Sequence, residues 1–338
     1  MSTRESTEPR TQACFDAGAR LAKRSPIERP MSNLELRVGR RSVGISRPDK
    51  LLFPEDGLTK ADVAQYYALM AGTMLPYLRD RPLYLRRFPD GITGVGIEQK
   101  RVPAYVPSWV KRLRVPQKHG GSLTQVICND AATLVYLADQ AAIELHAWLS
   151  RKDRLNLPDQ LIFDLDPPGT EFACVRETAR LLRDLLERLG LVPFLKSSGG
   201  AGLHVLCPIE RRTDFDGVRE FARSAAELLA ARHPDQLTVE QRKQRRRGRV
   251  FLDVYRNGYA QTAIAPYAIR ARPGAPIAAP LAWHELASYT PGRYVVGNAF
   301  ERLEKNGDPW RDLRRNARSL HEPRRRLAAL WSRKRSLA

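Results

Sequence analysis

The chain has 338 residues, 43% of them hydrophobic, so it can bury one large core or two smaller ones. Its 57 Lys and Arg residues outnumber 37 Asp and Glu residues, and the net charge of +20 favours nucleic acid as a polyanionic partner over a membrane surface. No stretch approaches the ~20 apolar residues of a membrane span, which argues against a membrane protein.

The N-terminal part of the chain predicts a leader followed by a strand and a helix. Residues 1–30 contain no apolar segment of a secretory signal and predict a disordered leader. Leu34–Ile45 predicts a strand or a strand of a hairpin. Thr59 predicts a helix start, because Asp62 three residues later completes a capping box.

Three more segments complete this first module. They are an extended segment at Leu83–Arg87, a glycine-rich loop from Gly91 to Gly96, and a basic loop at Trp109–His119. We expect residues 31–125 to form an N-terminal module that supports DNA binding.

The following residues predict alternating strands and helices. The expected order is a strand at Gln160–Leu165, a helix at Phe172–Leu189, strands at Val192–Lys196 and Leu203–Cys207, a helix at Phe215–His233, and a strand at Val250–Tyr255. This β-α-β-β-α-β order is typical of the split, ferredoxin-like arrangement, so we predict an α/β (α+β) fold. The catalytic core is expected at residues 126–300 and a basic, helical tail at residues 301–338.

Two carboxylates, Asp164 and Asp166, end the first of these strands. The two-residue period of a strand puts both on one face, with Leu165 on the other. Adjacent carboxylates repel unless a cation neutralises them, and a hard divalent ion bound through oxygen does so. The alternative is an exposed acidic strand end, which the apolar residues before Asp164 disfavour.

Asp253 ends the last apolar strand, and it supplies a third carboxylate. In the β-α-β-β-α-β order the first and last strands lie near each other, so Asp253 can meet Asp164 and Asp166. Three carboxylates beside a basic surface suit two-metal phosphoryl transfer. We therefore expect two hard divalent cations.

A glycine-rich turn, Ser198–Gly202, lies between two predicted strands, and His204 follows it. Backbone N–H groups of such a turn can cradle phosphate oxygens, and the Ser198 hydroxyl can add a donor. For the glycines alone, an ordinary hairpin turn is the simpler interpretation.

His146 lies in the apolar segment AIELHAWLS, where a lone histidine is more often a core residue whose hydrogen bonds are satisfied.

The four cysteines lie far apart without CxxC spacing, which excludes an obvious zinc or iron–sulfur site. Apolar neighbours predict core thiols at Cys128, Cys174 and Cys207. A reducing, cytoplasmic compartment, with the chain associated with the nucleoid, is the expected location.

Several motifs occur together and in order: IELHAWLSR, LIFDLDP, SSGGAGLHV and FLDVYRNGYAQTAIAPYAIRARPGAP. In this combination the chain resembles the polymerase domain of bacterial ATP-dependent DNA ligase D, in the archaeo-eukaryotic primase superfamily. The resemblance runs from about Arg47 to about Leu313. It implies a primase-polymerase fold with an RRM-like core and a stand-alone nucleotidyltransferase that repairs DNA ends.

The resemblance also implies roles for individual residues. The implied metal ligands are Asp164, Asp166 and Asp253, with His146 in the catalytic set; the implied nucleotide-binding residues are Ser198, Gly199, His204, Arg256 and Arg270; the implied DNA 5′-phosphate ligands are Lys50 and Lys60. The resemblance also implies two Mn²⁺ or Mg²⁺ ions, with Mn²⁺ preferred, and the addition of nucleotides from nucleoside triphosphates, with ribonucleotides preferred. The implied setting is bacterial non-homologous end joining, with Ku and a separate DNA ligase as partners.

Two positions depart from the family pattern. Ala201 stands where relatives often have a lysine, and Gly96-Ile97 stands where they often have a pair of phenylalanines. No KxDG adenylation motif occurs, so ligation is expected from another chain. The alternatives are a catalytically weak module that binds and bridges DNA ends, which both departures favour, and a metal-dependent nuclease built on the same carboxylates.

Overall fold

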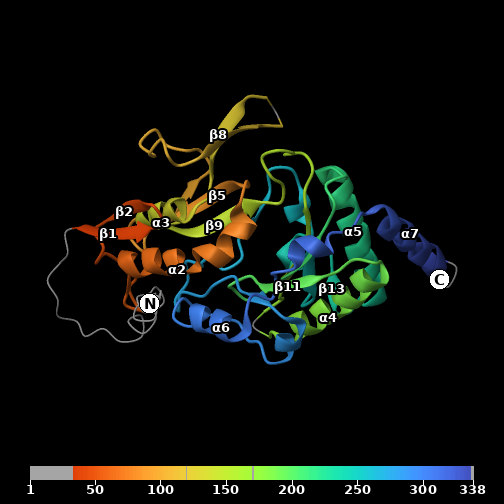
Figure 1. Ribbon diagram of the computed structural model, residues 1–338. Helices are drawn as coiled ribbons and strands as arrows, with labels where there is room; N and C mark the ends of the chain where they lie inside the picture. Colours follow the sequence, from red (N-terminus) through yellow and green to blue (C-terminus); the bar gives the residue numbers. More distant parts are fainter. Residues whose placement is uncertain (1–32, 119, 170, 336–338) are drawn as a thin grey trace, which may run out of the picture.

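A computed structural model describes residues 33–118, 120–169 and 171–335 of the chain. The predicted leader at residues 1–30, Cys14 and His119 lie outside these ranges. Two large β-sheets lie side by side along the long axis of the molecule, with helices packed around each of them (Figure 1).

The described N-terminal residues form two small hairpins and a long helix. The hairpins are β1 (Asn33–Val38) with β2 (Arg41–Ser46), and β3 (Leu51–Phe53) with β4 (Leu58–Thr59). Helix α2 (Lys60–Leu78) begins as predicted, because the Thr59 side chain accepts from the Asp62 amide and Asp62 accepts from the Thr59 amide. The buried hydroxyls of Tyr66 and Tyr67 donate to the carbonyls of Tyr267 and Ile143 at 2.7 Å each, which ties α2 to two distant segments of the chain.

The first large sheet has the order β15-β9-β5-β8-β7, with β6 paired to β5. Its strands are β5 (Pro82–Arg87), β6 (Ile97–Gln99), β7 (Arg112–Pro116), β8 (Ser122–Ile127), β9 (Ala142–Trp148) and β15 (Thr262–Ile264), and helix α3 (Ala131–Asp139) joins β8 to β9. The predicted boundary near residue 125 falls inside β8. Strands β5 and β9, on either side of that boundary, pair with each other.

The prediction of a loop at Trp109–His119 was wrong, because β7 occupies its centre. β7 forms an antiparallel hairpin with β8 from Arg112↔Val126 to Pro116↔Ser122. Val115 is the one buried residue of β7, so the strand shows almost no hydrophobic alternation. Backbone pairing with β8 therefore forms this strand, and sequence periodicity does not reveal it.

The second large sheet is the predicted core. Its strands are β10 (Gln160–Asp166), β11 (Phe194–Ser197), β12 (Leu203–Pro208), β13 (Leu237–Thr238), β14 (Val250–Asp253) and β16 (Pro280–Leu281), in the order β13-β14-β10-β12-β11-β16. The predicted β-α-β-β-α-β unit is confirmed, with β10 between β12 and β14. Strand β14 ends two residues earlier than predicted, since the chain turns there into a 3₁₀ helix.

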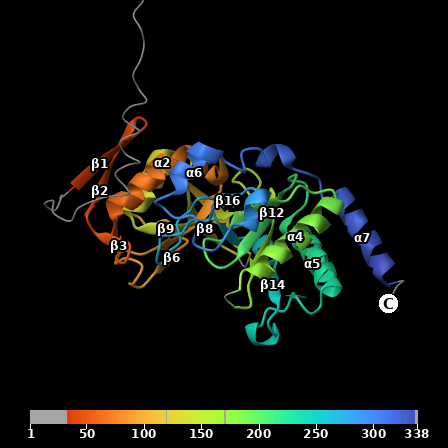
Figure 2. The same cartoon turned by 90° about the horizontal axis from the view of Figure 1, so that it is seen from below.

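Helices α4 (Ala173–Arg188) and α5 (Phe215–Arg232) confirm the two predicted core helices. They lie side by side against the core sheet (Figure 2). Apolar residues at helical spacing, such as Val175, Ala179, Leu182 and Leu186, are buried on α4. Gly190 follows α4 with φ +90°, the left-handed conformation that suits glycine after a helix.

The C-terminal residues pack onto the core and include the predicted helices. These helices are α6 (Ala299–Asn306) and α7 (His321–Arg335). Four short 3₁₀ helices lie between α5 and α7, at Lys243–Arg245, Tyr255–Asn257, Trp283–Ala287 and Leu313–Asn316. Trp310 is 1% exposed and its indole N–H donates to the Leu195 carbonyl at 2.9 Å. Trp331 of α7 donates to Ser224 of α5 at 3.0 Å.

Cys128 and Cys207 are buried free thiols, as predicted, but Cys174 is half-buried. It lies in the first turn of α4, where its thiol donates to the Glu171 carbonyl.

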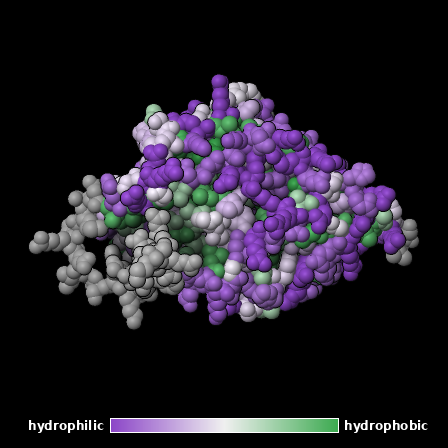
Figure 3. Space-filling model, in the orientation of Figure 1, coloured by the Kyte–Doolittle hydropathy of each residue, from purple (hydrophilic) through white to green (hydrophobic). Residues whose placement is uncertain are grey.

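Hydrophilic side chains cover most of the face shown in Figure 3. In the described part of the chain, no helix combines the length and the apolar character that crossing a bilayer requires.

Candidate active site

Three carboxylates meet where β10 and β14 pair. Asp164 lies directly opposite Asp253 in the antiparallel register, and Asp166 lies opposite Phe251. Asp164 is 6% exposed, whereas the Asp166 side chain is 45% exposed. Burial raises the pKa of Asp164 to about 7, and the charges of Asp166 and Asp253 act in the same direction. Burial and Asp253 also raise the pKa of Asp166.

Cationic and polar groups surround these carboxylates. The Arg256 Nε lies 3.6 Å from Asp164 Oδ2, and the Arg246 Nη1 lies 4.0 Å from Asp166 Oδ2. Asp253 Oδ1 accepts a hydrogen bond of 2.7 Å from the backbone N–H of Tyr255. The carboxylates are thus partly neutralised by arginines and by the backbone.

The donor set fits a hard divalent cation in its chemistry. Three carboxylates supply oxygen ligands. Burial raises the pKa of Asp164, the charges of Asp166 and Asp253 raise it further, and a bound cation would lower it. In the described residues, however, no three His, Cys, Asp or Glu side chains are already arranged around an ion position.

Arg256 reaches Asp164 because the turn after β14 is fixed to β10. Asn257 is fully buried, and its side-chain amide donates to the carbonyls of Ile162 and Val254 at 2.7 and 2.8 Å. Its Oδ1 accepts from the Ile162 amide at 2.9 Å. These bonds clamp the 3₁₀ helix at Tyr255–Asn257 against the centre of the core sheet.

The glycine-rich turn is more closed than predicted. The Ser198 hydroxyl oxygen accepts from the amides of Gly200 and Gly202, both at 3.2 Å, so these two N–H groups already have partners. Gly199 has φ +66°, and a Cβ there would lie 2.5 Å from the Arg270 side chain. The turn therefore needs glycine at this position for the close approach of Arg270.

Glu144, which the sequence reading did not single out, organises one wall of the site. It is 1% exposed, and Arg270 Nε and Arg86 Nη1 lie 2.9 and 3.0 Å from its oxygens. His146 Nε2 lies 3.1 Å from Glu144 Oε2. Burial acts to raise the pKa of Glu144, but His146 and Arg270 outweigh it and hold that pKa well below its usual range. The sequence signal for Glu144 is its position two residues before His146, which puts both side chains on the same face of one strand.

Lys196 is a second residue that the sequence reading missed. It pairs across the strands with His204, is 1% exposed, and donates to the Ile264 carbonyl at 3.2 Å. Burial lowers its pKa to about 7, while Asp164 acts to raise it. Burial also lowers the pKa of His204 well below its usual value, so the imidazole is neutral. His204 Nε2 lies 3.4 Å from Asp164 Oδ1.

These residues surround one cleft of about 230 Å³. Its lining includes the predicted residues His146, Asp164, Asp166, Ser198, His204, Arg256 and Arg270, together with Ala201 and Arg272. Gly199 lies in the turn at its edge, and Asp253 is the strand partner of Asp164. The structure therefore brings the predicted metal ligands and nucleotide-binding residues together from five separate segments.

Comparison with known proteins identifies the family of this chain. Residues 59–310 match the model of the LigD primase-polymerase domain. The chain belongs to this family. It is 33% identical over 269 residues to the multifunctional non-homologous end joining protein LigD of Mycolicibacterium smegmatis, and 33% identical over 280 residues to that of Pseudomonas aeruginosa. These alignments cover 79% and 82% of this chain, and it spans about a third of the length of each relative (35% and 33%).

A solved LigD structure also matches the fold. The polymerase domain of Mycobacterium tuberculosis ligase D, in complex with DNA, superposes with a TM-score of 0.76 and 32% identity. The match covers 81% of this chain and 99% of the solved one. The predicted primase-polymerase fold is therefore confirmed.

Lys50 and Lys60 lie apart from the cleft of this LigD-type domain. Lys50 pairs with Asp90 at 2.8 Å. Lys60 is 4% exposed, and its ammonium lies 3.1 Å from Ser46 Oγ and 3.4 Å from Asp139 Oδ1. The Lys60 amide donates to the Lys50 carbonyl at 2.8 Å, so the two residues adjoin. Their role in binding a 5′-phosphate stays a prediction.

Proposed function

We propose that this chain is a metal-dependent nucleotidyltransferase that adds nucleotides, ribonucleotides preferred, to the 3′ ends of broken DNA. The observation that carries the proposal is the pairing of Asp164 with Asp253, with Asp166 beside them at a cleft walled by Arg256 and Arg270. Membership in the LigD primase-polymerase family supports it. Bacterial non-homologous end joining is the proposed setting.

Asp164, Asp166 and Asp253 would hold two Mn²⁺ or Mg²⁺ ions. When bound, such ions would activate the attacking 3′-oxygen and neutralise charge on the reacting phosphate. Ion binding would offset the burial and the neighbouring negative charges that raise the pKa of Asp164. Arg256 and Arg246 would then be released from the carboxylates, so their guanidinium groups could turn to phosphate.

The opposite wall of the cleft would hold the triphosphate. Arg270 is anchored by Glu144 and also donates to the Ser198 carbonyl at 2.7 Å, so its guanidinium has a fixed place at the glycine-rich turn. Ser198 keeps its hydroxyl proton for donation, because its oxygen serves as the acceptor within the turn. His146 and the neutral His204 would orient the nucleotide beside the carboxylates.

The DNA duplex would bind over the basic surface around the cleft, with its 3′ end reaching the carboxylates. The net charge of +20 supplies attraction to phosphate. The solved relative in complex with DNA supports this part of the proposal. Lys50 and Lys60 would bind the 5′-phosphate of the break, and Ku and a separate DNA ligase would act as partners. Lys60 would need to exchange Asp139 for the phosphate.

Primer extension with labelled DNA ends, Mn²⁺ and nucleoside triphosphates tests the proposal. Longer products that form faster with ribonucleotides would support it. Shorter products would indicate a nuclease. A DNA that shifts in a gel but keeps its length, at every metal and nucleotide concentration, would indicate a module that only binds ends.

A further inference from the structure

A second cavity lies apart from the cleft of the carboxylates. It has a volume of about 520 Å³, and within the described residues the two linings have no member in common. Gln160, at the start of β10, and Pro208, at the end of β12, line it. Asp164 and His204 lie four residues away on the same strands, roughly 13 Å at 3.3 Å per residue. The cavity is therefore at the opposite end of these core strands.

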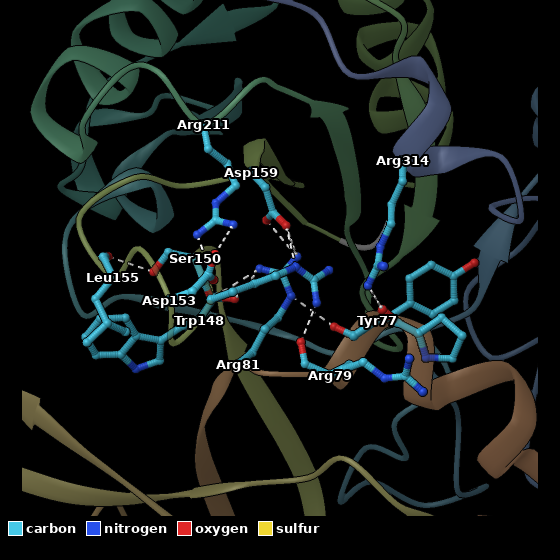
Figure 4. A network of polar contacts seen from close by, with 12 residues as sticks. Tyr77, Arg79, Arg81, Trp148, Ser150, Asp153, Leu155, Asp159, Arg211 and Arg314 are labelled. Atoms are coloured by element: carbon cyan, nitrogen blue, oxygen red, sulfur yellow. Dashed lines mark hydrogen bonds and ion pairs between the residues drawn. The ribbon is translucent and has the colours of Figure 1, made fainter.

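Positive charge is in excess in this cavity. Its lining contains six arginines, Arg81, Arg151, Arg154, Arg211, Arg212 and Arg314, and two carboxylates, Asp159 and Glu210. Arg212 pairs with Glu210 at 2.9 Å, and Arg211 pairs with Asp153 at 2.7 Å, so six arginines face three carboxylates. Figure 4 shows Arg81, Arg211 and Arg314 reaching this region from three different segments of the chain. The segments are distant in sequence, so the fold alone brings the guanidinium groups together.

The inner arginines share one carboxylate. Arg81 is 1% exposed and donates to both oxygens of Asp159 at 2.6 and 2.8 Å. Arg151 Nε donates to the same carboxylate at 2.8 Å. Burial lowers the pKa of Arg81 to about 10 against the effect of Asp159, so Arg81 stays protonated at neutral pH. Two guanidinium groups on one carboxylate leave a positive charge at the inner wall.

The outer arginines keep donors for a ligand. Arg154 is exposed, and its guanidinium makes no hydrogen bond or ion pair within the described residues. Arg314 donates from Nη2 to the Pro76 carbonyl at 2.8 Å. Arg211 is held by Asp153, yet its buried Nε has no partner among the described residues. Arg154 and Arg314, from two distant segments, therefore have donors available beside a surplus of charge.

We propose that this cavity is a second anion site and that its ligand is a small polyphosphate, such as pyrophosphate or the phosphate chain of a nucleotide. Guanidinium groups bind phosphate through paired hydrogen bonds, which suits convergent arginines better than lysines. The volume is in the range of sites for small molecules. A DNA duplex presents its phosphates on a convex surface and would not fill this concavity.

Calorimetric titration of the full chain with tripolyphosphate, with divalent ions chelated, tests the proposal. The Arg270→Ala background weakens binding in the cleft, so that the second site is measured alone. In that background we expect one tripolyphosphate site. Arg154→Ala with Arg314→Ala should weaken it at least tenfold, because both side chains are exposed donors. Arg180→Ala, an exposed arginine of α4 outside the cavity, should leave the affinity unchanged.

Melting temperatures separate a ligand site from a purely structural cluster. Tripolyphosphate should raise the melting temperature of the Arg270→Ala chain and of its Arg180→Ala derivative. It should not raise that of the cavity variant, which carries Arg154→Ala and Arg314→Ala in the same background. The proposal is overturned if the background chain binds no tripolyphosphate, or if the cavity variant binds it equally well. It is also overturned if the cavity variant no longer binds single-stranded DNA but still binds tripolyphosphate, which would assign the cavity to nucleic acid.

Discussion

The Glu144 carboxylate holds Arg270 through one oxygen, at 2.9 Å from Nε, and His146 through the other, at 3.1 Å. Its Oε1 also accepts from the Ala271 amide at 3.2 Å. One buried side chain thus positions two residues of the cleft. Glu144 itself does not line the cleft, so its proposed role is to place Arg270 and His146.

Glu144→Gln should impair nucleotide binding more than turnover. The amide can keep part of the hydrogen bonding but loses the charge that pairs with Arg270, a loss of about 1–3 kcal/mol for a charged hydrogen bond. We expect the nucleotide KM to rise roughly tenfold with a smaller fall in kcat. Glu187→Gln, on the exposed face of α4, is the control. Equal falls in kcat and kcat/KM with an unchanged KM would contradict the positioning role.

Ala201→Lys should strengthen nucleotide binding. Ala201 lines the cleft, so the substitution adds a positive charge beside the proposed triphosphate site. We expect a lower nucleotide KM, a nearly unchanged kcat, and a gain that shrinks at high salt. Ala201→Gln, which has a polar side chain but no charge, should not reproduce the gain. Steady-state nucleotide titrations measure KM and kcat of each variant. An unchanged KM in Ala201→Lys would mean that another cation already occupies this place.

The Asp159 carboxylate should make the folded chain less stable in acid. Burial acts to raise its pKa, but Arg81 and Arg151 outweigh it and lower the folded-state pKa. Its contribution to the free energy of unfolding is therefore complete above the unfolded pKa of about 3.9 and is lost as the pH falls through the lower folded value. Asp159→Asn should cost roughly 3–5 kcal/mol at pH 7, because it leaves Arg81 buried beside a neutral partner.

Urea unfolding between pH 2 and pH 7 measures this contribution. The difference between wild type and Asp159→Asn should shrink below pH 4. Asp184→Asn, at an exposed position of α4, should show no comparable trend. A difference that stays constant across the range would mean that the ion pair does not stabilise the fold.

Lys50→Gln should reduce the preference for a 5′-phosphate at the DNA end. Lys50 pairs with Asp90, whose side chain is 80% exposed, so the ammonium can exchange that partner for a phosphate. We expect the preference for 5′-phosphorylated over 5′-hydroxyl DNA to fall about tenfold, or roughly 1.4 kcal/mol, in competition binding. Arg180→Ala should retain the preference. Equal competition by both DNAs with the wild-type chain would place the phosphate elsewhere.

The sequence predicts the core of this fold well where local signals are strong. The capping box at Thr59, the amphipathic α4 and the strand order that joins Asp164 to Asp253 all follow from spacing and element order. Strand β7 was missed because it exposes most of its residues and forms through long-range pairing. The division into domains stays a prediction.

Features of the site that depend on distant contacts were not predictable. The burial of Lys60 against Asp139 joins residues 79 positions apart, and Glu144 meets Arg270 over 126 positions. Arg246 Nη1 lies 4.0 Å from Asp166 Oδ2, although the two residues are far apart in the sequence. Each of these contacts needs the packed fold, since neither partner carries a local signal for the other.

The most direct test of the central claim is nucleotide addition by Asp253→Asn. Asp253 is the cross-strand partner of Asp164, so the account makes it part of one metal-binding set, although it lies on a different strand. We predict that Asp253→Asn loses at least 10³-fold in primer extension with Mn²⁺, while its gel-shift affinity for DNA is unchanged or tighter. Asp184→Asn should extend primers normally. Extension by Asp253→Asn at a rate near that of wild type would contradict the three-carboxylate site.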